Sequence, residues 1–298
     1  IAVGTAELPI TFSSEDEGET GAGEWWGLHL GGFAPLYRGA PGRSDACYNL
    51  DPNTDHDHVD FNWCNEGSTV GNIGGDLASD TSGHMEYVRI LEAGGGPTDN
   101  NSGRSPHYAL YLGAVGFETS ISKIQIKDSL GTGIKVEGGT VNLSELVIAD
   151  AYGSDIEFDR GYQGNVQYLI TKKPDAPIDG SDRADSSIRS NWEGGSDNAY
   201  AVANATLLGG DMVNQRNEQG YATIRGVQFR DGVTAGLYNT AIKDFDAGCV
   251  EINDLNYDDD EGSVNLSSSV TIAHALGDCD YGFYPGWSRE ANSATDIR

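Results

Sequence analysis

Apolar and polar residues alternate in three consecutive segments of the chain, at residues 122–128, 144–150 and 166–172. This alternation is typical of a β-strand that buries one face. The segments keep a common register at a spacing of 22 residues. Two apolar columns carry the register: Ile124, Leu146 and Tyr168, and Ile126, Ile148 and Ile170.

A second short strand follows in each unit, over residues 133–136 and 155–158, and its column is Ile134, Ile156 and Ile178. Gly-rich turns separate the strands. A unit of this size cannot bury its own apolar face, so successive copies are expected to stack, with paired strands about 4.8 Å apart. The fixed Leu/Asn pattern of leucine-rich repeats is absent, and a propeller blade needs about 40 residues. The pattern therefore predicts an all-β fold, a right-handed parallel β-helix with coils of about 22 residues.

Outside residues 122–182 the 22-residue spacing is less regular. Further coil strands are expected over 86–91, 108–112, 200–208, 222–229 and 237–242, and inserted loops near 35–80, 94–106, 180–198 and 254–264. In repeat folds, insertions gather on one face, which is often the binding face. We expect a single domain over residues 1–298. Because the chain starts at Ile1, without Met and already strand-like, we expect a leader and the first coils to be missing.

The charge is strongly acidic: 18 basic and 46 acidic residues give −28. Such a surface repels nucleic acid and anionic lipid and attracts cations. Two interpretations are compatible with each other, a salt-adapted exported protein and a calcium-loaded protein. No run of 18 apolar residues occurs, so no transmembrane segment is expected.

Four cysteines occur, and none forms a C-x-x-C pair, which argues against a zinc ribbon or a thioredoxin-like site. Of the three possible connectivities, Cys47–Cys64 with Cys249–Cys279 closes the shortest loops. Disulfides imply an oxidising compartment, so we expect a secreted protein, extracellular or on the outer cell surface.

Four stretches of the chain resemble a known family: GTAELPITF (4–12), GEWWGLHLGGFAP (23–35), GIKVEGGTVNL (133–143) and DIEFDRGYQG (155–164). They are similar to secreted and lipoprotein-type bacterial β-helix proteins of the pectate-lyase-like superfamily, most of them uncharacterised. The resemblance covers most of residues 1–245 and implies the fold rather than an activity. Gly131 and Thr132 stand where the family usually carries paired Asp, so the resemblance implies no metal site at that turn.

An acidic segment between the first two cysteines suggests calcium. Its oxygen-bearing side chains follow the alternate spacing of calcium loops; they are Asp51, Asn53, Asp55 and Asp57. His56 and Asn62 stand where an EF-hand has Gly and Glu, so the segment is not an EF-hand. The alternatives are an acidic loop facing water, and a transition-metal site that uses His56 and His58.

Three carboxylates alternate with Ile156 and Phe158, which are expected to point inwards. Asp155, Glu157 and Asp159 should therefore line the outer surface of one coil. We interpret them as calcium ligands that bridge coils. The alternatives are a solvated face, neutralised by Lys135, Arg160 and Lys172, and an acid–base pair for glycoside hydrolysis.

Basic residues cluster in one stretch of this acidic chain, at Lys172, Lys173 and Arg183. The resemblance implies a use for them, because polysaccharide lyases of the superfamily take a proton next to a uronate carboxylate with a basic residue. One of these residues beside Asp155 could act in that way. The competing interpretation is ion pairing that relieves the acidic face, and no lyase motif is matched.

Aromatic residues are a further candidate site, for stacking on sugars or for capping the solenoid ends. They are Trp25, Trp26, Trp192 and the segment 281–287. Our leading hypothesis is a non-catalytic, calcium-stabilised extracellular β-helix that binds a glycan or a surface protein, or that self-assembles. The alternative is a polysaccharide lyase or glycoside hydrolase acting on an acidic or marine glycan.

Overall fold

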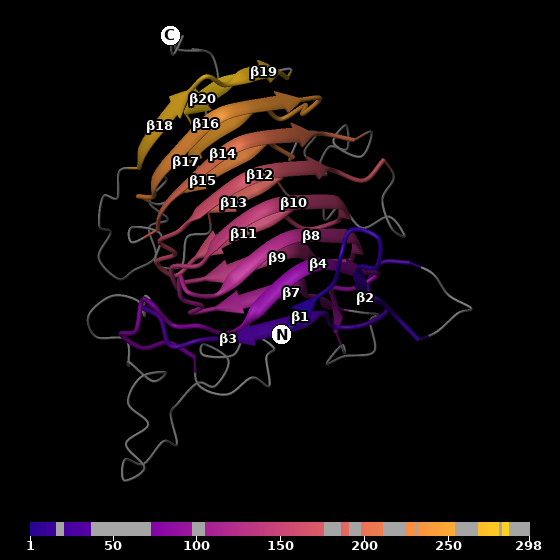
Figure 1. Ribbon diagram of the computed structural model, residues 1–298. Helices are drawn as coiled ribbons and strands as arrows, with labels where there is room; N and C mark the ends of the chain where they lie inside the picture. The colour runs from indigo at the N-terminus through magenta and orange to yellow at the C-terminus, as the bar shows by residue number, and fades with distance from the viewer. Residues whose placement is uncertain are drawn as a thin grey trace.

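The computed structural model describes residues 1–15, 21–36, 73–96, 105–175, 186–190, 198–210, 224–230, 232–253, 268–279 and 282–285. Strands and turns make up these residues, and parallel strands stack into two long sheets (Figure 1). A search of the same residues for a helix with the length and apolar character of a membrane span found none.

Sheet A has ten strands: β1 (Ala2–Val3), β2 (Ile10–Phe12), β4 (His84–Leu91), β8 (Ser120–Ser129), β10 (Asn142–Ala151), β12 (Asn165–Lys172), β14 (Ala199–Leu208), β16 (Thr234–Lys243), β18 (Ser269–Ala273) and β19 (Leu276–Asp278). Sheet B has eight strands: β3 (Leu28–Gly31), β7 (Tyr108–Gly113), β9 (Thr132–Glu137), β11 (Ile156–Asp159), β13 (Ile188–Ser190), β15 (Val227–Arg230), β17 (Val250–Asn253) and β20 (Phe283–Pro285). A small antiparallel pair joins β5 (Gly95–Gly96) to β6 (Ser105–Pro106).

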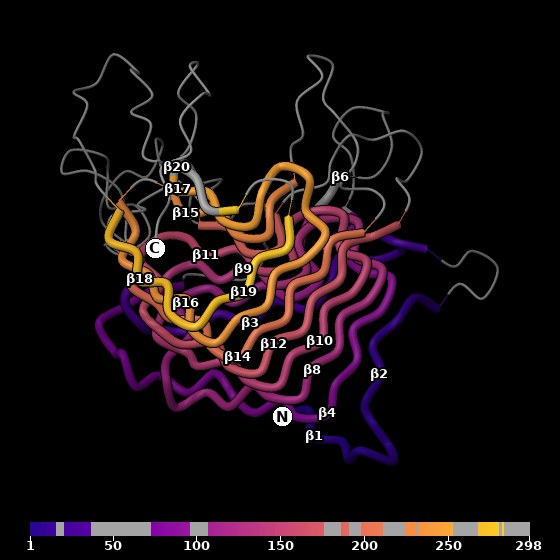
Figure 2. The backbone as a smooth tube through the Cα atoms, turned by 90° about the horizontal axis from the view of Figure 1, so that it is seen from above, coloured from indigo at the N-terminus to yellow at the C-terminus, as the bar shows by residue number. Residues whose placement is uncertain are grey.

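The chain passes from sheet A to sheet B and back in coil after coil, with parallel pairing between successive coils. It is a right-handed parallel β-helix, as the sequence predicted, and the right-handed path is the one that parallel crossovers take. Seen along the solenoid, the coils lie over one another as nested outlines (Figure 2). One apolar core fills the space between the sheets, and its members include Ile124, Leu146, Ile156 and Phe158.

Six strands of sheet A bend at a residue with a left-handed backbone that has the same place in the register; β8 and β10 have a second such residue near their ends, Asp128 and Asp150. The residues at the shared place form a column over six coils, with φ between 49° and 60°: Tyr87, Lys123, Glu145, Tyr168, Asn204 and Asn239. A left-handed backbone costs most L-residues about 1–2 kcal/mol but suits Asn. The Asn239 side chain donates a hydrogen bond to Asn204 Oδ1 across two coils. The bend divides the outer side of sheet A into a facet before the column and a facet after it.

The register of the third coil differs from the prediction. Leu146 pairs with Leu169 rather than with Tyr168, and Ile148 pairs with Thr171 rather than with Ile170. The turn between β11 and β12, residues 160–164, is one residue longer than the turn between β9 and β10, residues 138–141. A slip of one residue moves every side chain to the other face. Tyr168 and Ile170 are consequently about half exposed, while Leu169 lies in the core.

Sheet B departs from the predicted spacing as well. Ile156 pairs with Ile188 and not with Ile178, which lies outside the described residues. Strand β13 therefore stands within the stretch 180–198 that was expected to be a loop. Residues between the strands lengthen this coil beyond 22 residues, which is why the fixed spacing fails here.

The predicted disulfide Cys249–Cys279 is formed, with a Cα–Cα distance of 5.5 Å. Cys249 is fully buried just before β17, and Cys279 directly follows β19. The bond thus ties sheet B to sheet A beside β17 and β19, two strands near the C-terminal end of the solenoid in Figure 1. The other predicted pair, Cys47–Cys64, lies outside the described residues.

Candidate functional site: a buried ionic cluster on sheet B

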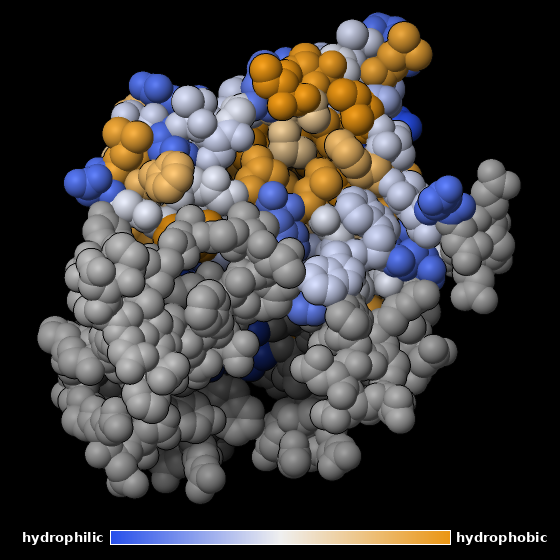
Figure 3. Space-filling view, turned by 90° about the horizontal axis from the view of Figure 1, so that it is seen from below, coloured by the Kyte–Doolittle hydropathy of each residue, from blue (hydrophilic) through white to orange (hydrophobic). Residues whose placement is uncertain are grey.

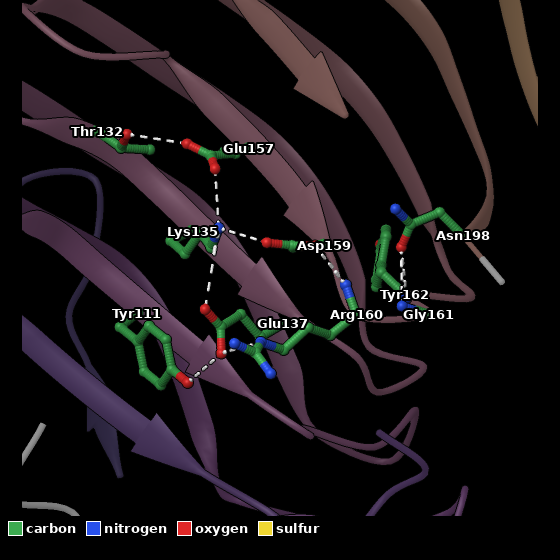
Figure 4. Close-up of polar contacts among 10 residues, drawn as sticks. All are labelled: Tyr111, Thr132, Lys135, Glu137, Glu157, Asp159, Arg160, Gly161, Tyr162 and Asn198. Carbon is green, nitrogen blue, oxygen red and sulfur yellow. Dashed lines mark hydrogen bonds and ion pairs between the residues drawn. The ribbon is translucent and has the colours of Figure 1, made fainter. Parts of the chain in front are cut away.

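The outer side of sheet B carries a cluster of charged side chains at β9 and β11 (Figure 4). Strand alternation explains its position: Ile134 and Val136 point into the core, so Lys135 and Glu137 point out. The parallel register then places Lys135 beside Glu157 and Glu137 beside Asp159. We call the following seven residues the ionic cluster: Tyr111, Thr132, Lys135, Glu137, Glu157, Asp159 and Arg160.

The Lys135 ammonium lies at the centre of the ionic cluster. Its Nζ is 2.8 Å from Glu157 Oε1, 3.0 Å from Asp159 Oδ2 and 3.8 Å from Glu137 Oε1. The side chains of Lys135 and Asp159 are each 2% exposed. The expectation that these carboxylates face solvent is therefore wrong: they point outwards from the sheet, but they are buried.

The remaining members hold the carboxylates in place. Tyr111 donates its hydroxyl to Glu137 Oε2 at 2.8 Å, and Arg160 Nε lies 3.5 Å from the same oxygen. The backbone N–H of Arg160 donates to Asp159 Oδ1 at 2.8 Å, and Thr132 donates to Glu157 at 3.4 Å.

The turn that follows β11 is fixed from the next coil. Asn198 Oδ1 accepts the backbone N–H groups of Gly161 and Tyr162, each at 2.9 Å (Figure 4). This contact holds the residues after Arg160 and so fixes the position of that side chain over the ionic cluster.

Burial and the neighbouring charges shift the pKa values of Lys135 and Asp159 in opposite directions. Burial favours a lower pKa of Lys135, but the attraction of Glu157, Asp159 and Glu137 outweighs it and holds the pKa well above its usual range. Burial raises the pKa of Asp159, and the neighbouring Lys135 only partly offsets this rise. Burial, and then the Glu137 charge, raise the pKa of Tyr111 well above its ordinary value.

The structure does not bring the three predicted calcium ligands together: Glu157 and Asp159 contact Lys135, whereas Asp155 pairs with Lys173. The part of the chain that the structure describes has no group of three or more His, Cys, Asp or Glu side chains arranged to hold an ion. Lys135 takes the position among the carboxylates that a cation would need. Two cations face three carboxylates in the ionic cluster, so the net charge there is only −1 and a divalent ion has little to gain.

Asp155 belongs to a separate ion pair inside the coil. Its Oδ1 lies 3.5 Å from Lys173 Nζ, and both side chains are fully buried. Lys173 Nζ also donates to the carbonyl oxygens of Ala151 and Gly153. Burial raises the pKa of Asp155, while the Lys173 charge opposes that rise.

The structure also places two of the predicted basic catalysts, Lys172 and Lys173. Lys173 does lie beside Asp155, but neither group reaches the surface where a polymer would bind. Lys172 points the other way and pairs with Asp175 at 2.8 Å. Ion pairing, the competing interpretation, describes both lysines. Arg183 lies outside the described residues.

Sheet A carries a second candidate, which the sequence did not predict. A shallow groove of about 340 Å³ crosses the facet before the bend, from β12 to β18. Its lining carries no charge, although one residue in five of this chain is charged. The lining residues are Gln163, Gly164, Asn165, Ala199, Tyr200, Ala201, Thr234, Ala235, Gly236, Tyr238, Ser269 and Thr271.

The Tyr238 ring lies against Gly236 in this groove, in space that a side chain at position 236 would occupy. A Cβ atom at Gly236 would come within 2.8 Å of the ring carbon Cζ, so any other residue would push the ring up. Tyr238 is 38% exposed. A flat aromatic ring surrounded by hydroxyl and amide groups is suited to a sugar ring. The sequence does hold one indication of this groove: charged residues are absent from the alternate, outward positions of three neighbouring strands.

The predicted aromatic residues near the N-terminus have different surroundings. Trp25 packs on the core and donates its indole N–H to the carbonyl of Leu91 at 2.8 Å. Trp26 stacks on His107 with 5.6 Å between the ring centroids, at the N-terminal end of the solenoid. Trp25 thus fits the capping interpretation. Trp192, Tyr281 and Trp287 lie outside the described residues.

The solenoid end at which the N-terminus lies is visible from below in Figure 3, where apolar side chains gather beside polar ones. Half-buried apolar residues of this end pack on the core, among them Ile10, Phe12 and Leu28. The predicted calcium segment, with Asp51, Asn53, Asp55 and Asp57, lies outside the described residues.

Comparison with known families gives a match over almost the whole chain: the profile of the pectate-lyase-like beta helix domain covers residues 1–276. Searches of curated proteins and of solved structures gave no significant match.

Proposed function

The chain belongs to the pectate-lyase-like β-helix family, and we propose that it is a non-catalytic extracellular protein that binds an uncharged glycan in the groove of sheet A. Domains of this family are often extracellular, and the Cys249–Cys279 disulfide fits an oxidising compartment. The observation that carries the proposal is the partly exposed Tyr238 ring, which lies against Gly236 in an uncharged groove.

The groove has the chemistry that a neutral sugar needs. Its hydroxyl and amide groups can donate to and accept from sugar hydroxyls; Thr234, Ser269 and Asn165 are examples. The groove crosses four coils, and neighbouring strands lie about 4.8 Å apart, so it can follow an extended chain of several sugar units. A uronate polymer would instead meet a protein that carries −28, without a basic side chain in the groove.

The charged groups of sheet B support a binding role better than a catalytic one. A glycosidase needs two carboxylates that reach the scissile bond, whereas Glu157 and Asp159 are buried against Lys135. We also propose that a calcium ion stabilises the protein and binds to Asp51, Asn53, Asp55 and Asp57.

Binding is tested by affinity electrophoresis and calorimetry with neutral polysaccharides such as β-glucans, mannans and xylans, and with uronate polymers for comparison. We expect Tyr238→Ala to weaken binding of a neutral glycan about ten-fold, or about 1.4 kcal/mol. Tyr168→Ala is the matched control, because Tyr168 is also exposed on sheet A but does not line the groove. Equal losses in both variants, or binding of uronates alone, would reject the groove as the site. Release of new reducing ends during incubation would establish an enzyme instead.

A further inference from the structure

The ionic cluster places a lysine, an aspartate and a glutamate in contact within the buried part of the fold. Lys135 Nζ lies 3.0 Å from Asp159 Oδ2, and the two residues stand on adjacent coils, in β9 and β11. From this geometry we infer that Lys135 and Asp159 become joined by an intramolecular isopeptide bond. The inference is independent of glycan binding.

The reaction is a condensation that needs no oxidant, reductant or cofactor. The Nζ atom of Lys135 attacks Cγ of Asp159, a C–N bond forms, and the bond from Cγ to Oδ2 breaks. An ammonium and a carboxylate together hold the atoms of one amide and one water molecule. Two of the three Nζ protons leave with Oδ2 as that water, and the third remains on the amide nitrogen.

The pair must first reach the reactive protonation state. The nucleophile is the neutral amine and the better electrophile is the protonated acid, so one proton must pass from Nζ to the carboxylate. Burial raises the pKa of Asp159 and favours the protonated acid, whereas the carboxylates around Lys135 favour its ammonium form, so this proton transfer should limit the rate of bond formation. Lys135 and Asp159 are each 2% exposed.

Two neighbours supply what the reaction needs at the reacting atoms. Glu157 Oε1 lies 2.8 Å from Lys135 Nζ, where it can take a proton from the nitrogen and return it to the departing Oδ2. The backbone N–H of Arg160 points at Asp159 Oδ1 at 2.8 Å and stabilises the negative charge that develops there in the tetrahedral intermediate. Thr132 donates to the other oxygen of Glu157 and orients that carboxylate.

The second buried lysine of this region lacks the same arrangement. Lys173 Nζ is 3.5 Å from Asp155, and its other contacts are the carbonyls of Ala151 and Gly153, which cannot relay a proton. The Lys173–Asp155 pair therefore serves as an internal control. The proposed bond would link successive coils of sheet B. Because it is an amide, the reducing agents that cleave disulfides would not break it.

Intact mass spectrometry of the full chain tests the inference, under denaturing conditions and after complete reduction of disulfides. We expect a mass lower than the sequence mass by one water molecule. Trypsin cannot cleave after a bonded Lys135, so the digest should contain the continuous peptide 128–160 lighter by one water, and further digestion with a glutamyl endopeptidase should release a branched peptide that joins 128–137 to 158–160. An unmodified mass would overturn the inference, and so would a water loss located as a cyclic imide in a linear peptide.

Three variants locate the chemistry. Lys135→Arg should restore the full sequence mass, and Lys173→Arg should keep the loss of one water. Glu157→Gln should retain the β-rich circular dichroism spectrum but form the bond at least ten times more slowly after purification. Complete bonding of Glu157→Gln would remove the proton-relay role, and loss of the bond in Lys173→Arg would contradict the assignment to Lys135. If Lys135→Arg fails to fold, the wild-type digest and Glu157→Gln still decide the question.

Discussion

Replacing Lys173 by Met tests whether the interior of this solenoid depends on a buried ion pair. Lys173 and Asp155 are both fully buried, with 3.5 Å between Nζ and Oδ1. The Lys173→Met variant fills most of the same volume but leaves the Asp155 carboxylate without its cation. It also removes the donor to the carbonyls of Ala151 and Gly153. Breaking a buried pair in this way costs about 3–5 kcal/mol, a large share of the 5–15 kcal/mol that stabilises a typical domain.

The stability that Lys173→Met loses relative to the wild type should depend on pH in a defined direction. Burial already raises the pKa of Asp155, and Lys173 opposes that rise, so the pKa of Asp155 is higher still in the variant. A carboxyl with a raised pKa binds a proton more readily in the folded chain than in the unfolded chain, so folding stability falls as pH rises between the two pKa values. The deficit of Lys173→Met should therefore be largest at neutral pH and shrink as pH falls towards about 4.

Urea unfolding followed by circular dichroism measures this deficit through the shift in midpoint, provided that the m-value is unchanged. Lys172→Met is the matched control, because Lys172 is the adjacent lysine but its side chain is 41% exposed. It contacts Asp175 and the backbone carbonyl of Lys173. An exposed pair of this kind contributes about 0–1 kcal/mol. A deficit of Lys173→Met below about 1 kcal/mol, or one that grows at low pH, would refute the reasoning.

Three further predictions follow from other parts of the fold. Leu169→Ala should cost about 2–5 kcal/mol in urea unfolding and Ile170→Ala less than about 1 kcal/mol, because only Leu169 is in the core; the reverse order would restore the register expected from the sequence. Cys249→Ser with Cys279→Ser should lower the free energy of unfolding by about 3 kcal/mol, and an unchanged midpoint would mean that the disulfide adds no stability. Calcium should raise the melting temperature of chelator-treated protein and should do so less in Asp55→Ala; equal shifts in both would exclude Asp55 as a ligand.

The fold could be predicted because stacking repeats one physical requirement in every coil. Alternation identifies strands with one buried face, and a 22-residue spacing correctly aligned Ile124 with Leu146 and Ile134 with Ile156. The alignment failed at Tyr168, because an apolar residue on the outer face looks the same in sequence as one in the core. Only a one-residue longer turn distinguishes the two registers, and alternation alone does not determine turn length.

The candidate site could be predicted only in part. The outward direction of Glu157 and Asp159 follows from alternation, and the coil spacing places Lys135 next to Glu157. Their burial does not follow, since it depends on what packs over the sheet rather than on the strand itself. Asp155 was assigned to the same outer face, yet it pairs with Lys173 inside the coil, because the strand begins only at Ile156 and strict alternation does not hold before it.

The distribution of charge connects the two sites with the proposed function. The chain carries −28, but the ionic cluster accounts for only one of these charges and the groove for none. The strong acidity therefore belongs to surfaces outside both sites, where salt screens charges beyond about 8 Å at physiological ionic strength. Binding of a neutral glycan in the groove should accordingly change little between low and high salt. An acidic ligand would have to overcome the field of the whole protein, and its binding would strengthen as salt is added. The salt dependence of affinity thus separates the groove, as an uncharged platform around Tyr238, from any site that works through the acidic surface.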